Sequence, residues 1–158
     1  MKAIVEWKGG LAFTGMGSSG IPILIDSHLS TDGKSMGVRP MEMIIIGLVS
    51  CMAMDVISIL EKKREVITSY QVSVDAPRSP EYPKVFTSAL VTFVVSGRSV
   101  KEIAVRRAIE LAVTKYCAAY VMLEKVFPIT ASYEIFEVEG DNHRRLLHQG
   151  VWQNTMQE

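Results

Sequence analysis

The sequence contains two cysteines, Cys51 and Cys117, and these are the residues whose type best suits chemistry. A cysteine thiolate is a nucleophile that can be oxidised and re-reduced, and two thiols that meet can form a disulfide. Each cysteine falls in a separate segment of helical pattern that we expect to be buried. Two packed helices can bring their Cβ atoms within disulfide reach when their faces match. We therefore predict that the two cysteines form the redox centre of a small thiol protein.

Cys51 lies on a narrow, less apolar stripe of its predicted helix. Gly47 precedes it by one turn and leaves the surface beside the sulfur free of a side chain, and Asp55 follows it by one turn. A reactive cysteine needs a positive or hydrogen-bonding neighbour, and Arg39, just before the helix, is a candidate. The alternative is that Cys51 is a small core residue, as buried cysteines often are. The residues alone leave both interpretations open.

Other kinds of site have weak support. The histidines lie in loop-like or terminal segments, at His28, His143 and His148, and do not combine with the cysteines into a zinc-binding spacing. The segment Gly15–Gly20 has G-x-G-x-x-G spacing, but Pro22 and a strand pattern follow it where a nucleotide site needs a helix. The G-x-S-x-G pattern of a nucleophilic serine is absent. We therefore expect neither a metal nor another cofactor.

Charge and composition favour a soluble cytoplasmic protein. Seventeen basic and seventeen acidic residues cancel, so no net field attracts nucleic acid or a membrane surface. The apolar run from Met43 to Met54 is too short to span a bilayer, and Lys8 interrupts what would be an export signal. Because the cytoplasm keeps thiols reduced, two cysteines are more plausibly inert or reactive than a permanent disulfide.

The pattern along the chain alternates strands with two long helices. Gly9-Gly10 permits the tight turn of a hairpin, Pro40 suits the first position of a helix, and Ser99–Glu102 has the form of a capping box. Prolines exclude helix between the fourth and fifth strands, and a polar loop is expected at Ser27 to Gly37. We expect strands at residues 3–7, 11–14, 21–25, 70–75, 85–95 and 129–138, and helices at residues 40–64 and 99–125.

This order predicts an α+β fold in which two central helices pack against antiparallel sheet. Residues 1–140 are expected to form a single domain, and residues 141–158 a polar C-terminal extension that packs locally or frays. The first helix is apolar on almost every face, so most of it should be buried. One small domain cannot easily cover two such helices, and dimerisation would solve that problem.

Two motifs resemble a known family. The run Gly37 to Met43, with letters GVRPMEM, followed by Gly47, Cys51 and Asp55-Val56, is similar to the central-helix motif of the OsmC/Ohr family, and Lys115-Tyr116-Cys117 resembles that family's second cysteine motif. The residues around Pro40 and after Cys51 are most similar to those of the YhfA-like branch. The resemblance extends over about residues 1 to 138.

The resemblance implies an OsmC-like fold, an intertwined homodimer and the reduction of organic hydroperoxides. Carried over, Cys51 would be the thiolate that attacks the peroxide and becomes a sulfenic acid. Cys117 would condense with it to a disulfide, which a dithiol reductant would reopen. The apolar helices would provide a water-poor pocket suited to alkyl or lipid peroxides.

The charged residues of this motif are shifted relative to the family's peroxidases. Their glutamate directly follows the proline, whereas here Met41 holds that place and Glu42 comes next; their activating arginine comes from an N-terminal strand, and Arg39 is the nearest replacement here. Glu42 and Cys51 are nine residues apart, so on a regular helix they face opposite sides, roughly 13 Å apart along the axis. Glu42 could assist Cys51 through an irregular helix start or across a dimer, or could simply complement the helix dipole.

Two further functions remain open from the sequence. One is a non-enzymatic dimer that binds a small apolar ligand or senses redox state, and it would tolerate serine at either cysteine. The other is an acyl-transfer enzyme, which would need Cys51 but not Cys117, although no histidine is placed as an obvious base.

Overall fold

The computed structural model describes residues 1–27, 37–139 and 143–152, and the predicted loop at Ser27 to Gly37 falls almost wholly outside them. The chain forms two compact units, Met1–Ile46 and Gly47–Glu158, which are described separately here.

The N-terminal unit contains a three-stranded antiparallel sheet in the order β1-β2-β3. Its strands are β1 (Ala3–Gly9), β2 (Ala12–Gly17) and β3 (Pro22–Ile25), close to the three predicted ones. Gly9 and Gly10 have φ angles of 112° and 55°, so the expected glycine turn joins β1 to β2. The G-x-G-x-x-G segment forms the end of β2 and the turn into β3, which confirms that no helix follows it.

Local backbone features explain where helix α1 (Pro40–Lys62) begins and ends. Pro40 occupies the first helical position, where a missing N–H costs nothing. At the other end Arg64 adopts a left-handed φ of 60°. Its N–H donates to the carbonyl of Glu61 at 2.9 Å, while the N–H of Glu65 donates to that of Leu60 at 3.1 Å. This is the Schellman pattern that satisfies the last helical carbonyls.

The C-terminal unit is built on a four-stranded sheet in the order β4-β5-β6-β7. Its strands are β4 (Val66–Asp75), β5 (Ala89–Arg98), β6 (Ile129–Glu139) and β7 (His143–Trp152). The central pair β5–β6 is parallel, and the other pairs are antiparallel. The sheet is therefore mixed rather than purely antiparallel. The helical segment between β5 and β6 carries the chain back to the end of the sheet at which β5 begins, so β6 runs in the same direction as β5.

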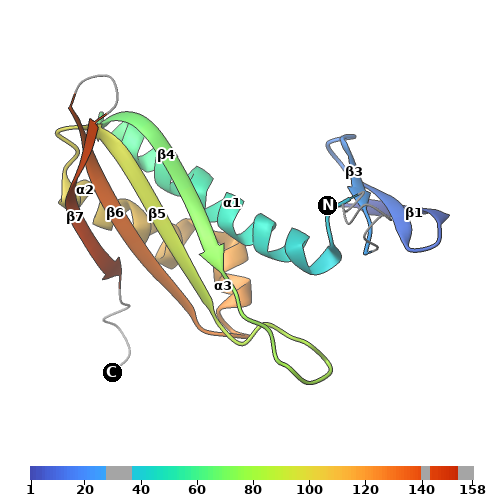
Figure 1. The fold of residues 1–158 in the computed structure, drawn as a ribbon. Coiled ribbons are helices and arrows are strands. Elements are labelled where there is room, and N and C mark those ends of the chain that lie inside the picture. The colour runs from blue at the N-terminus through green and yellow to red at the C-terminus, as the bar shows by residue number, and fades with distance from the viewer. Residues whose placement is uncertain (28–36, 140–142, 153–158) are drawn as a thin grey trace. The chain divides into compact units, whose positions relative to one another are not determined.

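The polar segment after residue 140 does not fray over its described part. Residues His143–Trp152 form strand β7, which pairs with β6 from one end to the other with one irregularity, between Ile135 and Phe136 (Figure 1). The proposed domain boundary at residue 140 remains a prediction, and this strand supplies one edge of the sheet.

The second helical segment is broken. It consists of α2 (Glu102–Leu111), a π-helical turn η1 (Ala112–Tyr116) and α3 (Ala118–Leu123). The predicted capping box at its start is wrong: Lys101 is the N-cap and makes no side-chain cap. The N–H of Ser99 is instead bound by the carboxylate of Glu137 at 2.9 Å, and Glu102 accepts from the Tyr133 hydroxyl at 2.6 Å. Partners distant in sequence have displaced the local motif.

One hydrophobic core lies between the sheet and the helices. In Figure 1, α2, α3 and the C-terminal part of α1 lie on one face of the four-stranded sheet. Alternate residues of β5 point into this core, at Val91, Phe93 and Val95. The buried residues of α1 share one face of that helix: Leu48, Met52, Val56 and Leu60.

The expectation that most of α1 is buried is wrong for the single chain. The described chain covers only one face of α1, and large apolar side chains such as Ile46 and Met54 stay exposed. By length and composition α1 could also cross a membrane, a test that core helices of soluble proteins pass as well.

Candidate functional site: a thiol pair and a carboxylate

Helix α1 presents Cys51 and Asp55 side by side because they are four residues apart. Helical side chains lean toward the N-terminus, so the Asp55 carboxylate leans toward Cys51 and the Cys51 sulfur toward Gly47. Gly47 is exposed, and a Cβ placed on it would meet nothing within 4 Å among the described residues. The approach to Cys51 from that side is open, as the sequence predicted.

The break in the second helical segment positions Cys117. Its backbone is extended, with φ −76° and ψ 99°, and it caps α3: its Sγ accepts a hydrogen bond from the N–H of Tyr120 at 3.4 Å. The prediction that Cys117 lies inside a helix is therefore wrong. The thiol instead sits at the junction between η1 and α3, where it is wholly buried.

The structure brings the two thiols together with Asp55. The sulfurs of Cys51 and Cys117 and a carboxylate oxygen of Asp55 all lie within 4.8 Å of one another. Both cysteines are free thiols; Cys51 is partly exposed and Cys117 is not. Burial, together with the hydrogen bond with Cys51 and the charges of Cys51 and Asp55, raises the pKa of Cys117 to about 12, although the Tyr120 N–H lowers it in part. Cys117 is therefore a neutral thiol, and Cys51 is the one a solute can reach.

Asp55 is the member of this cluster to which the sequence analysis gave no role. Its Oδ2 atom is buried and accepts no hydrogen bond from any described residue. Burial raises the pKa of this carboxyl above its usual range. The signal was present in the sequence as the four-residue spacing from Cys51, but the distance to Cys117 depends on the tertiary fold.

Arg39 and Glu42 pair with each other at the start of α1. The Glu42 carboxylate accepts from the backbone N–H of Arg39 at 3.1 Å, and its other oxygen lies 3.8 Å from the Arg39 guanidinium. A glutamate at the third helical position that reaches back to the N-cap N–H is half of a capping box, and it also complements the helix dipole. Because α1 is continuous from Pro40 to Lys62, the irregular helix start is not observed.

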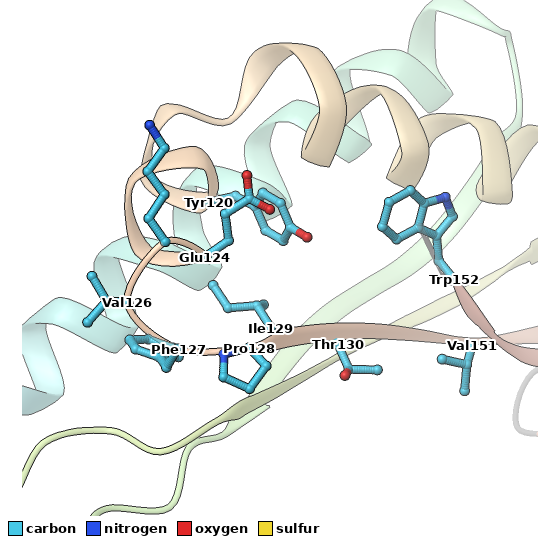
Figure 2. A pocket seen from close by; sticks show the side chains of 10 residues that line it. Tyr120, Glu124, Val126, Phe127, Pro128, Ile129, Thr130, Val151 and Trp152 are labelled. Atoms are coloured by element: carbon cyan, nitrogen blue, oxygen red, sulfur yellow. The ribbon is translucent and has the colours of Figure 1, made fainter. Parts of the chain in front are cut away.

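An open cavity of about 540 Å³ is lined in part by Tyr120, the residue whose backbone N–H bonds the Cys117 sulfur. Figure 2 shows Trp152 of β7 at one end of this cavity and Val126 and Phe127 at the other, with Tyr120 and Ile129 between them. Burial and the neighbouring Glu124 raise the pKa of Tyr120 to about 12, so its phenol stays neutral. The lining of the cavity therefore combines the aromatic side chains of Tyr120, Phe127 and Trp152 with the charged residues Glu124 and Lys125.

Comparison with known proteins identifies the family of this chain. The OsmC-like protein family matches residues 31–132, about two thirds of the chain and the part that holds both cysteines. The chain belongs to the OsmC-like family. It is 41% identical over 135 residues to Protein YhfA of Escherichia coli K12, with 85% of this chain and 98% of that protein covered.

Solved structures share the fold. A hypothetical protein from Aquifex aeolicus is 25% identical, with a TM-score of 0.76 over 87% of this chain and 97% of that one. An organic hydroperoxide resistance protein OsmC from Legionella pneumophila is 11% identical, with a TM-score of 0.60 over 84% of this chain and 96% of that one. The α+β architecture expected from the sequence is thus that of OsmC-like proteins.

Proposed function

We propose that this protein is a thiol peroxidase that reduces organic hydroperoxides through Cys51 and Cys117. The observation that carries the proposal is the contact between one accessible and one buried thiol, no more than 4.8 Å apart, with a carboxylate beside both. Hydroperoxide resistance in the name of the Legionella relative points to the same class of substrate.

In the first step the Cys51 thiol gives its proton to the Asp55 carboxylate. The thiolate attacks the outer oxygen of the hydroperoxide, a sulfur–oxygen bond forms, and the oxygen–oxygen bond breaks. The leaving alkoxide takes the proton back from Asp55 and departs as an alcohol. Cys51 is left as a sulfenic acid, oxidised by two electrons, and Asp55 returns to its starting state.

In the second step the buried thiol resolves this sulfenic acid. Cys117 gives its proton to Asp55, its sulfur attacks the sulfur of Cys51, and hydroxide leaves and takes up that proton as water. The sulfurs must approach by at most about 2.8 Å to reach the disulfide bond length of about 2.05 Å. A dithiol reductant then returns both cysteines to thiols by thiol–disulfide exchange and is itself oxidised to a disulfide.

We also propose that Arg39 and Glu42 assist this chemistry as a charged pair. Since α1 has a regular start, we propose that Arg39 and Glu42 act on Cys51 across a dimer, where the pair would face the Cys51 of the other subunit. Replacing either by glutamine should then slow the reaction of Cys51 with peroxide, whereas a purely capping role for Glu42 would leave that rate unchanged.

We propose that the protein acts as a cytoplasmic homodimer. Exposed apolar side chains support this, because each unit of the chain leaves several uncovered, among them Ile4 (63%) and Trp7 (64%) in the N-terminal unit and Met54 (71%) on α1. Large exposed apolar patches mark interaction surfaces in soluble proteins. A cytoplasmic setting would provide the thiol reductants that the catalytic cycle consumes.

The test is to titrate the reduced protein with cumene hydroperoxide and with hydrogen peroxide, counting thiols and locating any disulfide by mass spectrometry. We expect rapid loss of both thiols, a Cys51–Cys117 disulfide and a preference for the organic peroxide. Cys51→Ser should not react, and Cys117→Ser should consume one equivalent and stop. Thiols that react no faster than free cysteine would overturn the proposal and favour a dimer that binds an apolar ligand.

A further inference from the structure

We propose that Cys51, Cys117 and Asp55 also form a binding site for a thiophilic divalent cation, with Zn²⁺ as the expected occupant, when both thiols are reduced. The sequence predicted no metal site because the histidines do not combine with the cysteines. The fold instead supplies a carboxylate as the third donor. Binding rests on this geometry alone, and only its consequence for peroxide chemistry rests on the proposed function.

The spacing of the three donor atoms fits a tetrahedral ion. Zinc bonds of about 2.3 Å to sulfur and about 2.1 Å to oxygen hold the donors of a tetrahedral site about 3.6–3.8 Å apart. The two sulfurs and the Asp55 oxygen already lie within 4.8 Å of one another. The three side chains would therefore fill three of the four positions of a tetrahedral site.

The local charges also suit a cation. Ligand thiols bind metals as thiolates, so two cysteines and Asp55 would together carry three negative charges, of which a divalent ion balances two. No described residue donates a hydrogen bond to the buried Asp55 Oδ2, so this atom has a free lone pair for a ligand. The Tyr120 N–H that bonds the Cys117 sulfur would hold that ligand in place, as outer contacts do in metal sites.

The donor set and the access route favour zinc with one open position. Two sulfurs and one oxygen select soft or borderline ions over magnesium and calcium, which prefer oxygen alone. Cys51 is partly exposed beside the open surface at Gly47, so an ion can enter and a water molecule can complete the tetrahedron.

A bound ion and a disulfide exclude each other. Two-electron oxidation of the ligand thiolates by one organic hydroperoxide, with two protons taken up, would give the Cys51–Cys117 disulfide, one alcohol and one water, and would release the Zn²⁺. Zinc would thus protect the reduced pair, and peroxide would set the ion free.

The experiment is a titration of the reduced, metal-free chain with Zn²⁺ against a chromogenic chelator, without peroxide. We expect one ion per chain, a loss of affinity of at least about 100-fold in Cys51→Ser and in Cys117→Ser, and at least about 10-fold in Asp55→Asn, since even outer-shell changes cost roughly 10–100-fold. Glu61→Gln, an exposed carboxylate at the end of the same helix, is the matched control and should bind as the wild type does. Circular dichroism checks that each variant is folded.

Three results would overturn the inference: unchanged binding in Cys51→Ser, unchanged binding in Asp55→Asn, or equal binding by the chain oxidised to the disulfide with diamide. The first and third would place the ion elsewhere, for example at the exposed His148, which lies 3.4 Å from the Glu102 carboxylate. A chain that binds zinc but does not turn over peroxide would refute only the proposed function. A chain that turns over peroxide but ignores zinc would refute only this inference.

Discussion

Cys117 combines a proposed redox role with a structural one, and two substitutions can separate them. Its sulfur caps α3 by accepting the Tyr120 N–H, and α3 has only six residues, too few to be stable without tertiary support. Serine is a favoured N-cap residue and can accept the same hydrogen bond, whereas alanine cannot. Cys117→Ser should therefore remove the thiol and keep the cap, and Cys117→Ala should remove both.

The difference in stability follows from the cap. Losing an N-cap acceptor costs about 1 kcal/mol, so Cys117→Ala should be less stable than Cys117→Ser by about that amount. For a chain of this size, about 1 kcal/mol corresponds to a Tm lower by roughly 2–4 °C. In the buried site the serine hydroxyl also has an acceptor nearby, because a carboxylate oxygen of Asp55 lies within 4.8 Å of the Cys117 sulfur.

The assay is urea denaturation of both variants in excess reductant, followed by peroxide titration of each. Neither variant should form an intramolecular disulfide, and only the alanine variant should lose the stability that the cap of α3 contributes. If the two variants unfold at the same urea concentration, the sulfur does not cap α3, and the account of how Cys117 is positioned fails.

Three further substitutions test the packing around the site. Gly97→Ala should destabilise the fold by at least about 2 kcal/mol in urea denaturation, because its Cβ would overlap the carbonyl oxygen of Val66 and backbone cannot move aside. Gly47→Ala is the matched glycine on α1 with open space around it, and it should stabilise by up to about 1 kcal/mol; a loss of stability there would show that another surface covers this position. Tyr133→Phe removes the 2.6 Å hydrogen bond to Glu102 and should lower Tm by roughly 2–4 °C, the equivalent of about 1 kcal/mol, since water can reach the freed carboxylate; an unchanged Tm would mean that this bond contributes nothing to stability.

The features that depend on local spacing could be predicted from the sequence. The helix start at Pro40, the glycine turn at Gly9-Gly10 and the open face beside Cys51 follow from residue type and helical periodicity, and the structure confirms them. The α+β order follows equally from where strand and helix patterns alternate. That the two thiols meet could only be hypothesised, because it depends on how α1 packs against the broken helical segment around Cys117, which is far away in the sequence.

The features that sequence reasoning missed or predicted wrongly depend on long-range partners. Ser99 and Glu102 have the right spacing for a capping box, but Glu137 and Tyr133 on β6 bind their groups instead. The segment His143–Trp152 has no strict alternation of apolar and polar residues, and it becomes a strand because β6 offers it a paired edge. The periodicity of a sequence describes one segment at a time, so it gives no information about partners that lie far away in the sequence.

The π-helical turn η1 has a consequence for how this protein can change in evolution. A π turn accommodates one more residue than an α turn over the same rise, so it amounts to a single-residue insertion. Each residue advances an α-helix by about 100°, so deletion of one residue within Ala112–Tyr116 would rotate the following thiol by about that angle. Such a deletion would alter none of the side chains in the cluster and yet would separate Cys117 from Cys51. The length of this segment, and not only the identity of its residues, is therefore under constraint wherever the thiol pair is used.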